Sequence, residues 1–511
     1  MKHFFARSLF LTASLATFTP HLLADVTLPA IFSDHMVLQA EAPVPVWGWA
    51  EPDEQVTVSI GDQTKTAKAD ASGKWKLNLD KLESGKVTSL TIKGKNTVTV
   101  NDVLTGEVWL CSGQSNMAML VKNSKDYEQE KVAADFPKIR MFRESSRANP
   151  SVQEKCNGTW MVCSPETVGN FSATAYFFGR ELYKKINQPI GLINSSVGGT
   201  PIEAWTSLEA QKDIPELKPI LEKWKKMEME WDPEKEKAQH EKLLAKYNED
   251  VAKEGGKSDK TLRPPRRPEA PLTSPERPTN LFNSKIAPLI PYAIKGAIWY
   301  QGETNASRGG LYDITLPLMI KDWRTRWNQG DFPFAWVQLP GYMKAQEKPV
   351  EDGGWPCIRE FMLKSLSVPN TGMAITIDVG EAGNIHPVNK QEVGKRLAMW
   401  ALAKVYGQNC ASSGPLPSGH EIKGSEIICS FKNTDGGLLA REGELKGFAI
   451  AGADKKWFKG SAKIEGDKVI VSSPEVKEPK AVRYAWANNP ECNLFNGAGI
   501  PASPFRTDDW K

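Results

Sequence analysis

Between Leu104 and Tyr406, short apolar runs alternate with longer segments of helical periodicity, and this rhythm constrains the fold more than any other feature of the chain. Short apolar runs bounded by turn residues are typical of buried strands, and longer periodic segments are typical of helices. Their alternation predicts a doubly wound α/β domain around a parallel sheet. The predicted strands lie near 108 and at 189–194, 293–300, 332–339 and 373–378, and the predicted helices at 172–186, 312–327, 358–366 and 390–406.

The segments on either side of residues 104–406 have a different pattern. In residues 25–103 and again in 407–511, short alternating runs are separated by Pro, Gly, Asp and Ser, which predicts an N-terminal and a C-terminal β domain of sandwich-like type. Residues 207–278 interrupt the α/β pattern with a predicted long amphipathic helical insertion and a Pro-rich loop. Its many charges are more typical of a solvated helix face than of a binding site.

The first 24 residues have the pattern of a secretory signal peptide. Lys2 and Arg7 precede an apolar run at 8–18, and Ala24 is a small residue at a plausible cleavage point. The run is too short to stay as a membrane span, and no later segment approaches the roughly 20 apolar residues that a membrane helix needs. We therefore expect a secreted or periplasmic protein without a membrane span.

Charge and cysteine pattern narrow the classes of function. The formal net charge of +4 becomes +2 when Lys2 and Arg7 are removed, which gives no electrostatic argument for nucleic-acid or membrane binding. The seven cysteines are scattered without a C-x-x-C pair, so we expect no zinc site. A disulfide between Cys156 and Cys163 is possible in an exported protein, and the sequence leaves the oligomeric state open.

Ser115 follows the first predicted strand of the α/β region. The segment Glu107–Met117 is apolar as far as Cys111 and then breaks at Gly113 into a polar turn. Ligands of parallel sheets bind at the carboxyl ends of the strands, so this turn can present a nucleophilic hydroxyl. An ordinary polar loop is the alternative interpretation of this segment alone.

A serine nucleophile needs a base, which is most often histidine. Of the six histidines, His386 is the one that lies in the α/β region outside the insertion, in the loop after the strand that ends at Asp378. The alternative is a loop histidine that caps a helix. Two further strand ends carry candidate oxyanion donors, which are the backbone N–H groups of Gly198 and Gly199 and the side-chain amides of Gln301 and Asn305.

These segments together resemble the sialate O-acetylesterase family of SGNH hydrolases. The similarity spans the mature chain apart from the helical insertion. It rests on Gly113–Met117, Gly198–Thr200 with Glu203–Trp205, Trp299–Glu303, Ile385–Pro387 with Lys390, Val393-Gly394 and Arg396-Leu397, and on Met36–Gln39, Val482–Trp486 and Pro504–Asp508 in the β regions.

The resemblance implies a flavodoxin-like SGNH hydrolase core that removes acetyl groups from carbohydrates without a metal or another cofactor. It implies Ser115 as the nucleophile and His386 as its base. The oxyanion hole would be formed by the N–H groups of Ser115 and of Gly198 or Gly199, with Gln301, or else Asn305, as side-chain donor. Glu303 is expected to organise its loop. The residues expected to shape the substrate pocket are Asn116, Trp205 and Tyr300, and a place in the core is the alternative for the two aromatic side chains.

One position departs from the family pattern. Many relatives have Asp-Ile-His-Pro, whereas this chain has Asn384 before Ile385 and His386. In a serine protease triad, an amide at the position of the orienting acid lowers kcat about 10⁴-fold. Asp378 and Glu381 are therefore candidates for the orienting acid, and a Ser–His dyad or a backbone carbonyl partner is the alternative.

The preferred function is a serine esterase that removes O-acetyl groups from carbohydrates, with sialate O-acetylesterase activity through an acetyl-serine intermediate. An acetylxylan or other polysaccharide acetylesterase is the first alternative. A carbohydrate-binding protein that has lost turnover is the alternative from another class. A metal-dependent deacetylase is disfavoured because the α/β region offers one histidine where such sites need several nitrogen ligands.

Overall fold

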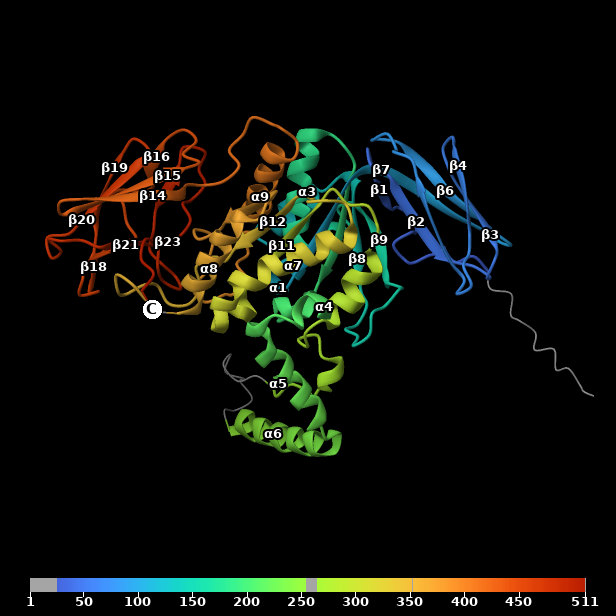
Figure 1. The fold of residues 1–511 in the computed structure, drawn as a ribbon, viewed down its shortest axis with the longest axis horizontal. Coiled ribbons are helices and arrows are strands. Elements are labelled where there is room, and N and C mark those ends of the chain that lie inside the picture. The colour runs from blue at the N-terminus through green and yellow to red at the C-terminus, as the bar shows by residue number, and fades with distance from the viewer. Residues whose placement is uncertain (1–24, 254–263, 352, 511) are drawn as a thin grey trace, which may run out of the picture.

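The computed structural model describes residues 25–253, 264–351 and 353–510. The predicted signal peptide, residues 1–24, lies outside the described residues. Along the long axis of the molecule, a β region from the N-terminal part of the chain lies at one end and a β region from the C-terminal part at the other (Figure 1). An α/β region lies between them.

The α/β region is built on a mixed sheet in which all pairings between neighbouring strands are parallel except that of the edge strand β9. The five strands predicted from the sequence are confirmed, whereas β8 and β9 were not predicted. In spatial order the strands are β13 (Thr371–Ile375), β12 (Phe334–Gln338), β11 (Gly296–Tyr300), β7 (Thr97–Gly113), β10 (Ile190–Ser196), β8 (Phe136–Glu144) and β9 (Gly158–Cys163).

The helices cover a sheet whose central strands are buried on both faces. Every residue of β11 and β12 is buried, as expected for parallel strands between two helical layers. Helix α3 (Ala173–Ile186) packs closely against α9 (Lys390–Lys404) and lies on β10. Helix α7 (Tyr312–Trp327) packs against α8 (Gly354–Lys364), and these two helices connect β11, β12 and β13.

Strand β7 belongs to two regions of the molecule. Its first half pairs with β6 (Val87–Lys93) of the N-terminal β region, and its second half lies between β10 and β11. The predicted boundary between 103 and 104 therefore falls inside one continuous strand of 17 residues. The remaining N-terminal strands are β1 (Val37–Gln39), β2 (Val44–Trp49), β3 (Gln55–Ile60), β4 (Gln63–Lys68) and β5 (Lys74–Leu79).

The C-terminal β region contains two four-stranded antiparallel sheets and a strand pair, and it encloses an apolar cluster of its own. The cluster includes Ile427, Phe448, Val482 and Tyr484. The strands are β14 (Leu416–Lys423), β15 (Glu426–Lys432), β16 (Leu438–Ala440), β17 (Phe448–Ala451), β18 (Trp457–Lys459), β19 (Ser461–Glu465), β20 (Lys468–Ser472), β21 (Ala481–Tyr484), β22 (Leu494–Asn496) and β23 (Phe505–Arg506).

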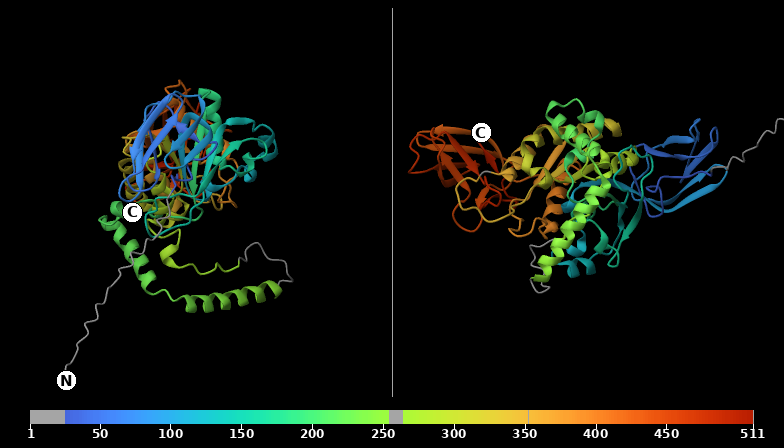
Figure 2. Two further views of the ribbon diagram at one scale, coloured as in Figure 1. Left: turned by 90° about the vertical axis from the view of Figure 1, so that its right-hand side faces the viewer. Right: turned by 90° about the horizontal axis from the view of Figure 1, so that it is seen from below.

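The insertion projects from one side of the α/β region (Figures 1 and 2). It is not one long helix but three, α4 (Leu208–Gln211), α5 (Lys218–Met229) and α6 (Pro233–Lys253). The predicted periodicity was correct within α5, but Pro215 and Pro233 introduce breaks because proline cannot donate a backbone hydrogen bond inside a helix. Among the described residues, no helix has the length and apolar composition needed to cross a membrane.

All seven cysteines lie in the part of the chain that the structure describes, and all are free thiols. The possible disulfide between Cys156 and Cys163 is therefore absent. Both side chains are buried, and burial raises the pKa of the Cys156 thiol to about 11 and that of Cys163 to about 12. These cysteines act as small apolar side chains in the core.

Candidate active site

Ser115 lies at the carboxyl end of β7, as the sequence predicted. The strand ends at Gly113, whose φ of +139° is unfavourable for any residue with a β-carbon. A β-carbon at this position would lie 2.1 Å from the carbonyl oxygen of Tyr300 on the neighbouring strand. The chain then turns, and Ser115 begins the short helix α1 (Ser115–Ala118) with its side chain partly exposed.

His386 reaches Ser115 from the other end of the sheet. It lies in the loop between β13 and α9, and its Nε2 is 2.8 Å from Oγ of Ser115, although 271 positions separate the two residues. Burial lowers the pKa of His386, and the nearby charge of Lys390 lowers it further. A neutral imidazole is therefore favoured, and it can accept the hydroxyl proton.

The two candidate orienting acids do not contact the imidazole. Asp378 forms a two-pronged ion pair with Arg396, with oxygen–nitrogen distances of 2.5 and 2.8 Å. Glu381 accepts hydrogen bonds from the backbone N–H of Val388 at 2.7 Å and from Nδ2 of Asn384 at 3.0 Å. Within the described ranges, no residue hydrogen-bonds Nδ1 of His386. The geometry corrects both assignments and matches the dyad alternative.

Asn384, the position that departs from the family pattern, shapes the loop instead of the imidazole. Its Oδ1 accepts a hydrogen bond from the backbone N–H of His386 at 3.0 Å, and its Nδ2 donates to Glu381. An amide can do both, since it has a donor and an acceptor. An aspartate here would place a second carboxylate against Glu381.

A buried polar network connects the segment of Ser115 to the loop of His386. Asn116 donates from Nδ2 to Oε1 of Glu303 at 2.5 Å and to the carbonyl of Ile385 at 3.0 Å. Lys390, which is fully buried, donates from Nζ to Oδ1 of Asn116 at 2.7 Å and to the carbonyl of Pro387 at 2.6 Å. The carbonyl groups on both sides of His386 are thus held by one network.

The charges of this network are perturbed by their surroundings. Burial lowers the pKa of Lys390 to about 7, against the opposing influence of Glu303 and Glu381. Burial raises the pKa of the Glu303 carboxyl. The sequence reasoning used Lys390 as a motif residue but assigned it no role. The available signal was a lysine three residues after Asn-Ile-His-Pro at a helix start, a position where a cation is unfavourable.

The predicted backbone donors of the oxyanion hole belong to Ser115 and to the Gly198-Gly199 segment. Gly198 follows β10 and lies so close that a β-carbon on it would be 3.3 Å from Cβ of Ser115. Gly199 adopts φ of +74°. In the described parts of the chain, no backbone or side-chain acceptor takes a hydrogen bond from the N–H of Ser115, Gly198 or Gly199. These three groups are therefore free to donate to a ligand oxygen.

The chain is similar in sequence to known enzymes over nearly its whole length. It is 30% identical to the sialate O-acetylesterases of mouse and human, with 92% and 93% of this chain and 92% and 91% of the relatives covered. It belongs to the sialate O-acetylesterase family. A family model described as carbohydrate esterase, sialic acid-specific acetylesterase, matches residues 105–232. The protein is thus a carboxylic ester hydrolase.

A solved structure supports the same relationship. The crystal structure of a carbohydrate acetylesterase from Xanthomonas citri is 34% identical in sequence and superposes with a TM-score of 0.80. It covers 95% of this chain and 100% of the other. The fold of this sialate O-acetylesterase family member, including both β regions, is therefore shared along the full length of a known carbohydrate acetylesterase.

Two predicted oxyanion donors of this family member point elsewhere. Nε2 of Gln301 donates to the carbonyl of Thr200 at 3.1 Å and to Oδ1 of Asn305 at 2.7 Å. Nδ2 of Asn305 in turn donates to both carboxylate oxygens of Glu203, at 3.0 and 3.3 Å. Both amides are buried, so their N–H groups hold the loops together and are not available to an oxyanion.

The residues predicted to shape the substrate pocket are also buried. Trp205 and Tyr300 are each 0% exposed, and Trp205 packs edge-on against Trp299 at a centroid distance of 5.9 Å. Asn116 is equally buried, with its side chain engaged in the polar network. These three side chains form the core below the site. None of the three side chains presents a free surface in the structure.

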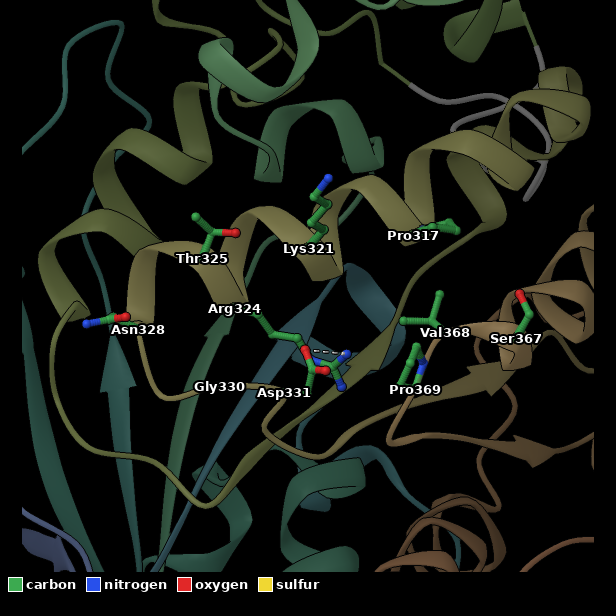
Figure 3. A pocket seen from close by; sticks show the side chains of 10 residues that line it. All are labelled: Pro317, Lys321, Arg324, Thr325, Asn328, Gly330, Asp331, Ser367, Val368 and Pro369. Atoms are coloured by element: carbon green, nitrogen blue, oxygen red, sulfur yellow. Dashed lines mark ion pairs between the residues drawn. The ribbon is translucent and has the colours of Figure 1, made fainter.

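One large cavity of the esterase lies away from the Ser115–His386 pair (Figure 3). It measures about 720 Å³ and is lined by residues such as Arg324 and Asp331, whose charged groups are 3.6 Å apart. Asp331 precedes β12 and Pro369 precedes β13, so the cavity lies at the amino ends of these strands. Ser115 and His386 follow the carboxyl ends, and this cavity is not part of their site.

Proposed function

We propose that the protein is a serine esterase that removes O-acetyl groups from carbohydrates through an acetyl-serine intermediate. The observation that carries this proposal is the 2.8 Å contact between Oγ of Ser115 and Nε2 of His386 at the carboxyl ends of a parallel sheet. The names of the relatives, sialate O-acetylesterase and carbohydrate acetylesterase, support an acetylated sugar as substrate. O-acetylated sialic acid is the proposed sugar, and another acetylated polysaccharide such as xylan is the alternative.

In this mechanism, the neutral imidazole of His386 accepts the hydroxyl proton while Oγ of Ser115 attacks the acetyl carbonyl carbon. The N–H groups of Ser115, Gly198 and Gly199 donate to the oxyanion of the tetrahedral intermediate. When the intermediate collapses, the carbon–oxygen bond to the sugar breaks, and the imidazolium returns the proton to the leaving sugar oxygen. A water molecule, deprotonated by His386, then hydrolyses the acetyl-serine to acetate.

The strand order supports a flavodoxin-like SGNH core. Strand β7, which ends just before Ser115, lies in the middle of the sheet. Strands β11, β12 and β13 follow one another in the chain and continue to one side of β7, while β10 and β8 lie on its other side. We place the N-terminal β domain, this core with its insertion, and the C-terminal β domain at 25–103, 104–406 and 407–511. Residues 1–24 are proposed to export the enzyme to the periplasm or the medium.

The experiment that tests the function compares wild type with Ser115→Ala. Purified wild-type protein is expected to release acetate from 4-nitrophenyl acetate and from O-acetylated sugars. The variant should lose about 10⁴-fold or more of kcat, because the nucleophile and base act as a unit. Ser307→Ala, a change of an exposed serine in the neighbouring 3-10 helix Glu303–Leu311, is the matched control and should retain activity.

Undiminished hydrolysis by Ser115→Ala would rule out the acetyl-serine mechanism. A wild-type protein that binds glycans but releases no acetate would instead support the non-catalytic alternative. Comparing acetate release from 9-O-acetylated sialic acid and from acetylated xylan distinguishes the two substrate proposals.

A further inference from the structure

A cavity of about 360 Å³ lies between helix α5 of the insertion and the loops that follow β10 and β11. Trp224 and Lys223 line it from the insertion. Glu203, Thr304 and Arg308 line it from the loops. The helix and the two loops therefore enclose one space, although they come from three separate parts of the chain.

This cavity adjoins the Ser115 site. The backbone N–H of Thr304 donates to Oε1 of Gln114, the residue before Ser115, at 3.4 Å. Pro201, which also lines the cavity, is two residues beyond Gly199. Helix α1, which begins at Ser115, lies on the side of the α/β region from which α5 extends (Figure 1). A substrate held at Ser115 can therefore extend into the cavity.

The wall formed by the insertion is fixed in position. Glu228, one helical turn after Trp224, forms an ion pair of 2.6 Å with Arg277, and both side chains are less than a quarter exposed. The chain after Arg277 returns to the active-site loop, where the N–H of Thr279 donates to the carbonyl of Glu203 at 3.0 Å. These contacts hold α5 against the loop that carries Glu203.

Trp224 is not a core residue. Its side chain is half-buried, and the ring borders a second cavity, of about 450 Å³, in addition to the first. An aromatic ring with an accessible face and a fixed backbone offers an apolar surface to the C–H face of a sugar ring. The large tryptophans of the α/β core, such as Trp205 and Trp299, are fully buried and cannot do this.

The charges that line the cavity are balanced. Arg308 donates to both carboxylate oxygens of Glu203, at 3.0 and 3.3 Å. Lys223 and Glu276 add one charge of each sign. The side chain of Glu203 is 1% exposed and that of Arg308 is 36% exposed, so the guanidinium is the member of the pair that can present donors to the cavity. Because Glu203 balances its charge, the site suits a neutral hydroxyl group better than an anion.

We propose that this cavity binds the neutral pyranose residue next to the acetylated sugar in a glycan chain, with Trp224 as its stacking surface and the guanidinium of Arg308, held in place by Glu203, as its hydroxyl partner. The proposal rests on the proposed function, since it extends the site of Ser115. The insertion thereby selects oligosaccharide substrates over small acetyl esters.

The test compares Trp224→Ala with wild type on three substrates: 4-nitrophenyl acetate, O-acetylated sialyllactose and acetylated xylo-oligosaccharides. Loss of the stacking surface should lower kcat/KM for the preferred oligosaccharide about tenfold, mainly through a higher KM. The kcat/KM for 4-nitrophenyl acetate should stay unchanged. Trp224→Phe should restore most of the loss. Trp231→Ala is the matched control, because Trp231 lies in the same insertion and lines neither cavity.

Equal losses on the small ester and the oligosaccharide would overturn the proposal, because they would indicate a structural role for Trp224. Equal effects of Trp224→Ala and Trp231→Ala on the oligosaccharide would also overturn it. The two oligosaccharides show which glycan occupies the cavity. Failure of the proposed function would be seen separately, as acetate release from 4-nitrophenyl acetate that does not depend on Ser115.

Discussion

Lys390 is a fully buried lysine whose contacts lie on both sides of the Ser115–His386 pair. Its ammonium group binds Asn116 and the carbonyl of Pro387, while Asn116 binds the carbonyl of Ile385. The backbone on both sides of His386 is therefore fixed relative to the residue after Ser115. We infer that this network orients the imidazole through its backbone.

Lys390→Met is expected to change both the rate and its pH dependence. The network would lose its central donor, and kcat should fall about 10- to 100-fold, the range typical of lost supporting hydrogen bonds at a catalytic centre. The Lys390 charge lowers the pKa of His386. The charged groups that act on Lys390 itself are Glu303 and Glu381. Without that charge the pKa of His386 rises, so the acid limb of the kcat/KM profile should move to higher pH.

The measurement is a pH–rate profile with 4-nitrophenyl acetate. Lys395→Met, on the same helix with a side chain 54% exposed, is the control and should keep the wild-type profile. An acid limb that stays in place in Lys390→Met, together with an unchanged kcat, would show that the network has no part in orienting or tuning His386.

At the level of strands and helices, the turn after β7 depends on the absence of a side chain at Gly113. Gly113→Ala should be strongly destabilising, because the φ of +139° alone costs about 1–3 kcal/mol for a residue with a β-carbon. The clash with the Tyr300 carbonyl, at 2.1 Å, adds to this and would separate β7 from β11 just before Ser115. We expect a lower midpoint in thermal unfolding and loss of esterase activity in the fraction that folds.

Gly310→Ala provides the comparison for this prediction. Gly310 is exposed, and a β-carbon there would meet no atom within 4 Å, so the variant should unfold like wild type. If Gly113→Ala also unfolds like wild type and keeps its activity, the turn tolerates a β-carbon and the argument from its geometry fails.

The sequence predicted the central strands because they are continuous apolar runs, as expected for strands buried on both faces. It did not predict β8, since Pro137, Lys138 and Arg140 interrupt the pattern although the middle of the strand is buried. Prolines also divide the insertion, which the spacing of apolar residues alone could not indicate. The local sequence pattern therefore predicts strands well where both faces of the sheet are buried, and poorly at the edge of the sheet.

The same distinction applies to the site. The contact between Ser115 and His386 could be predicted because chemistry restricts the possible pairs and parallel strands bring their ends together. Gln301 and Trp205 were assigned to the wrong side of their loops, since a sequence does not show which way a side chain faces after a strand ends. Whether the N–H groups of Gly198 and Gly199 can reach a ligand depends on the direction of the backbone. The paired glycines in the sequence indicated a turn but not its direction.

At the scale of the whole molecule, the C-terminal β region contacts the loops that support His386. Arg359 of α8 is 0% exposed and donates to the carbonyls of Leu339 and Pro340 after β12, at 2.8 and 2.6 Å. It also donates to the carbonyls of Ala487 and Asn488 of the C-terminal region, at 2.7 and 2.8 Å. One buried guanidinium thus joins the two regions.

A second set of contacts continues from this junction to the His386 loop. The N–H of Tyr342 donates to the carbonyl of Asn488 at 3.2 Å, and the N–H of Met343 donates to the carbonyl of Ala382 at 3.1 Å. Ala382 lies four residues before His386. The C-terminal region is therefore expected to affect catalysis as well as stability.

Arg359→Met should uncouple these regions. The carbonyl oxygens of Leu339, Pro340 and Ala487 would lose their charged donor, whereas that of Asn488 keeps the N–H of Tyr342. Each unsatisfied group costs about 1–3 kcal/mol, so we expect the free energy of unfolding to fall by at least about 3 kcal/mol. Urea denaturation followed by tryptophan fluorescence measures this loss, and kcat for 4-nitrophenyl acetate should fall with it under native conditions. Arg266→Met, which changes a side chain that is 92% exposed, should alter stability by less than about 0.5 kcal/mol. Since the predicted loss comes from the junction alone, equal unfolding midpoints for the two variants would mean that the C-terminal region does not support the catalytic loop through Arg359.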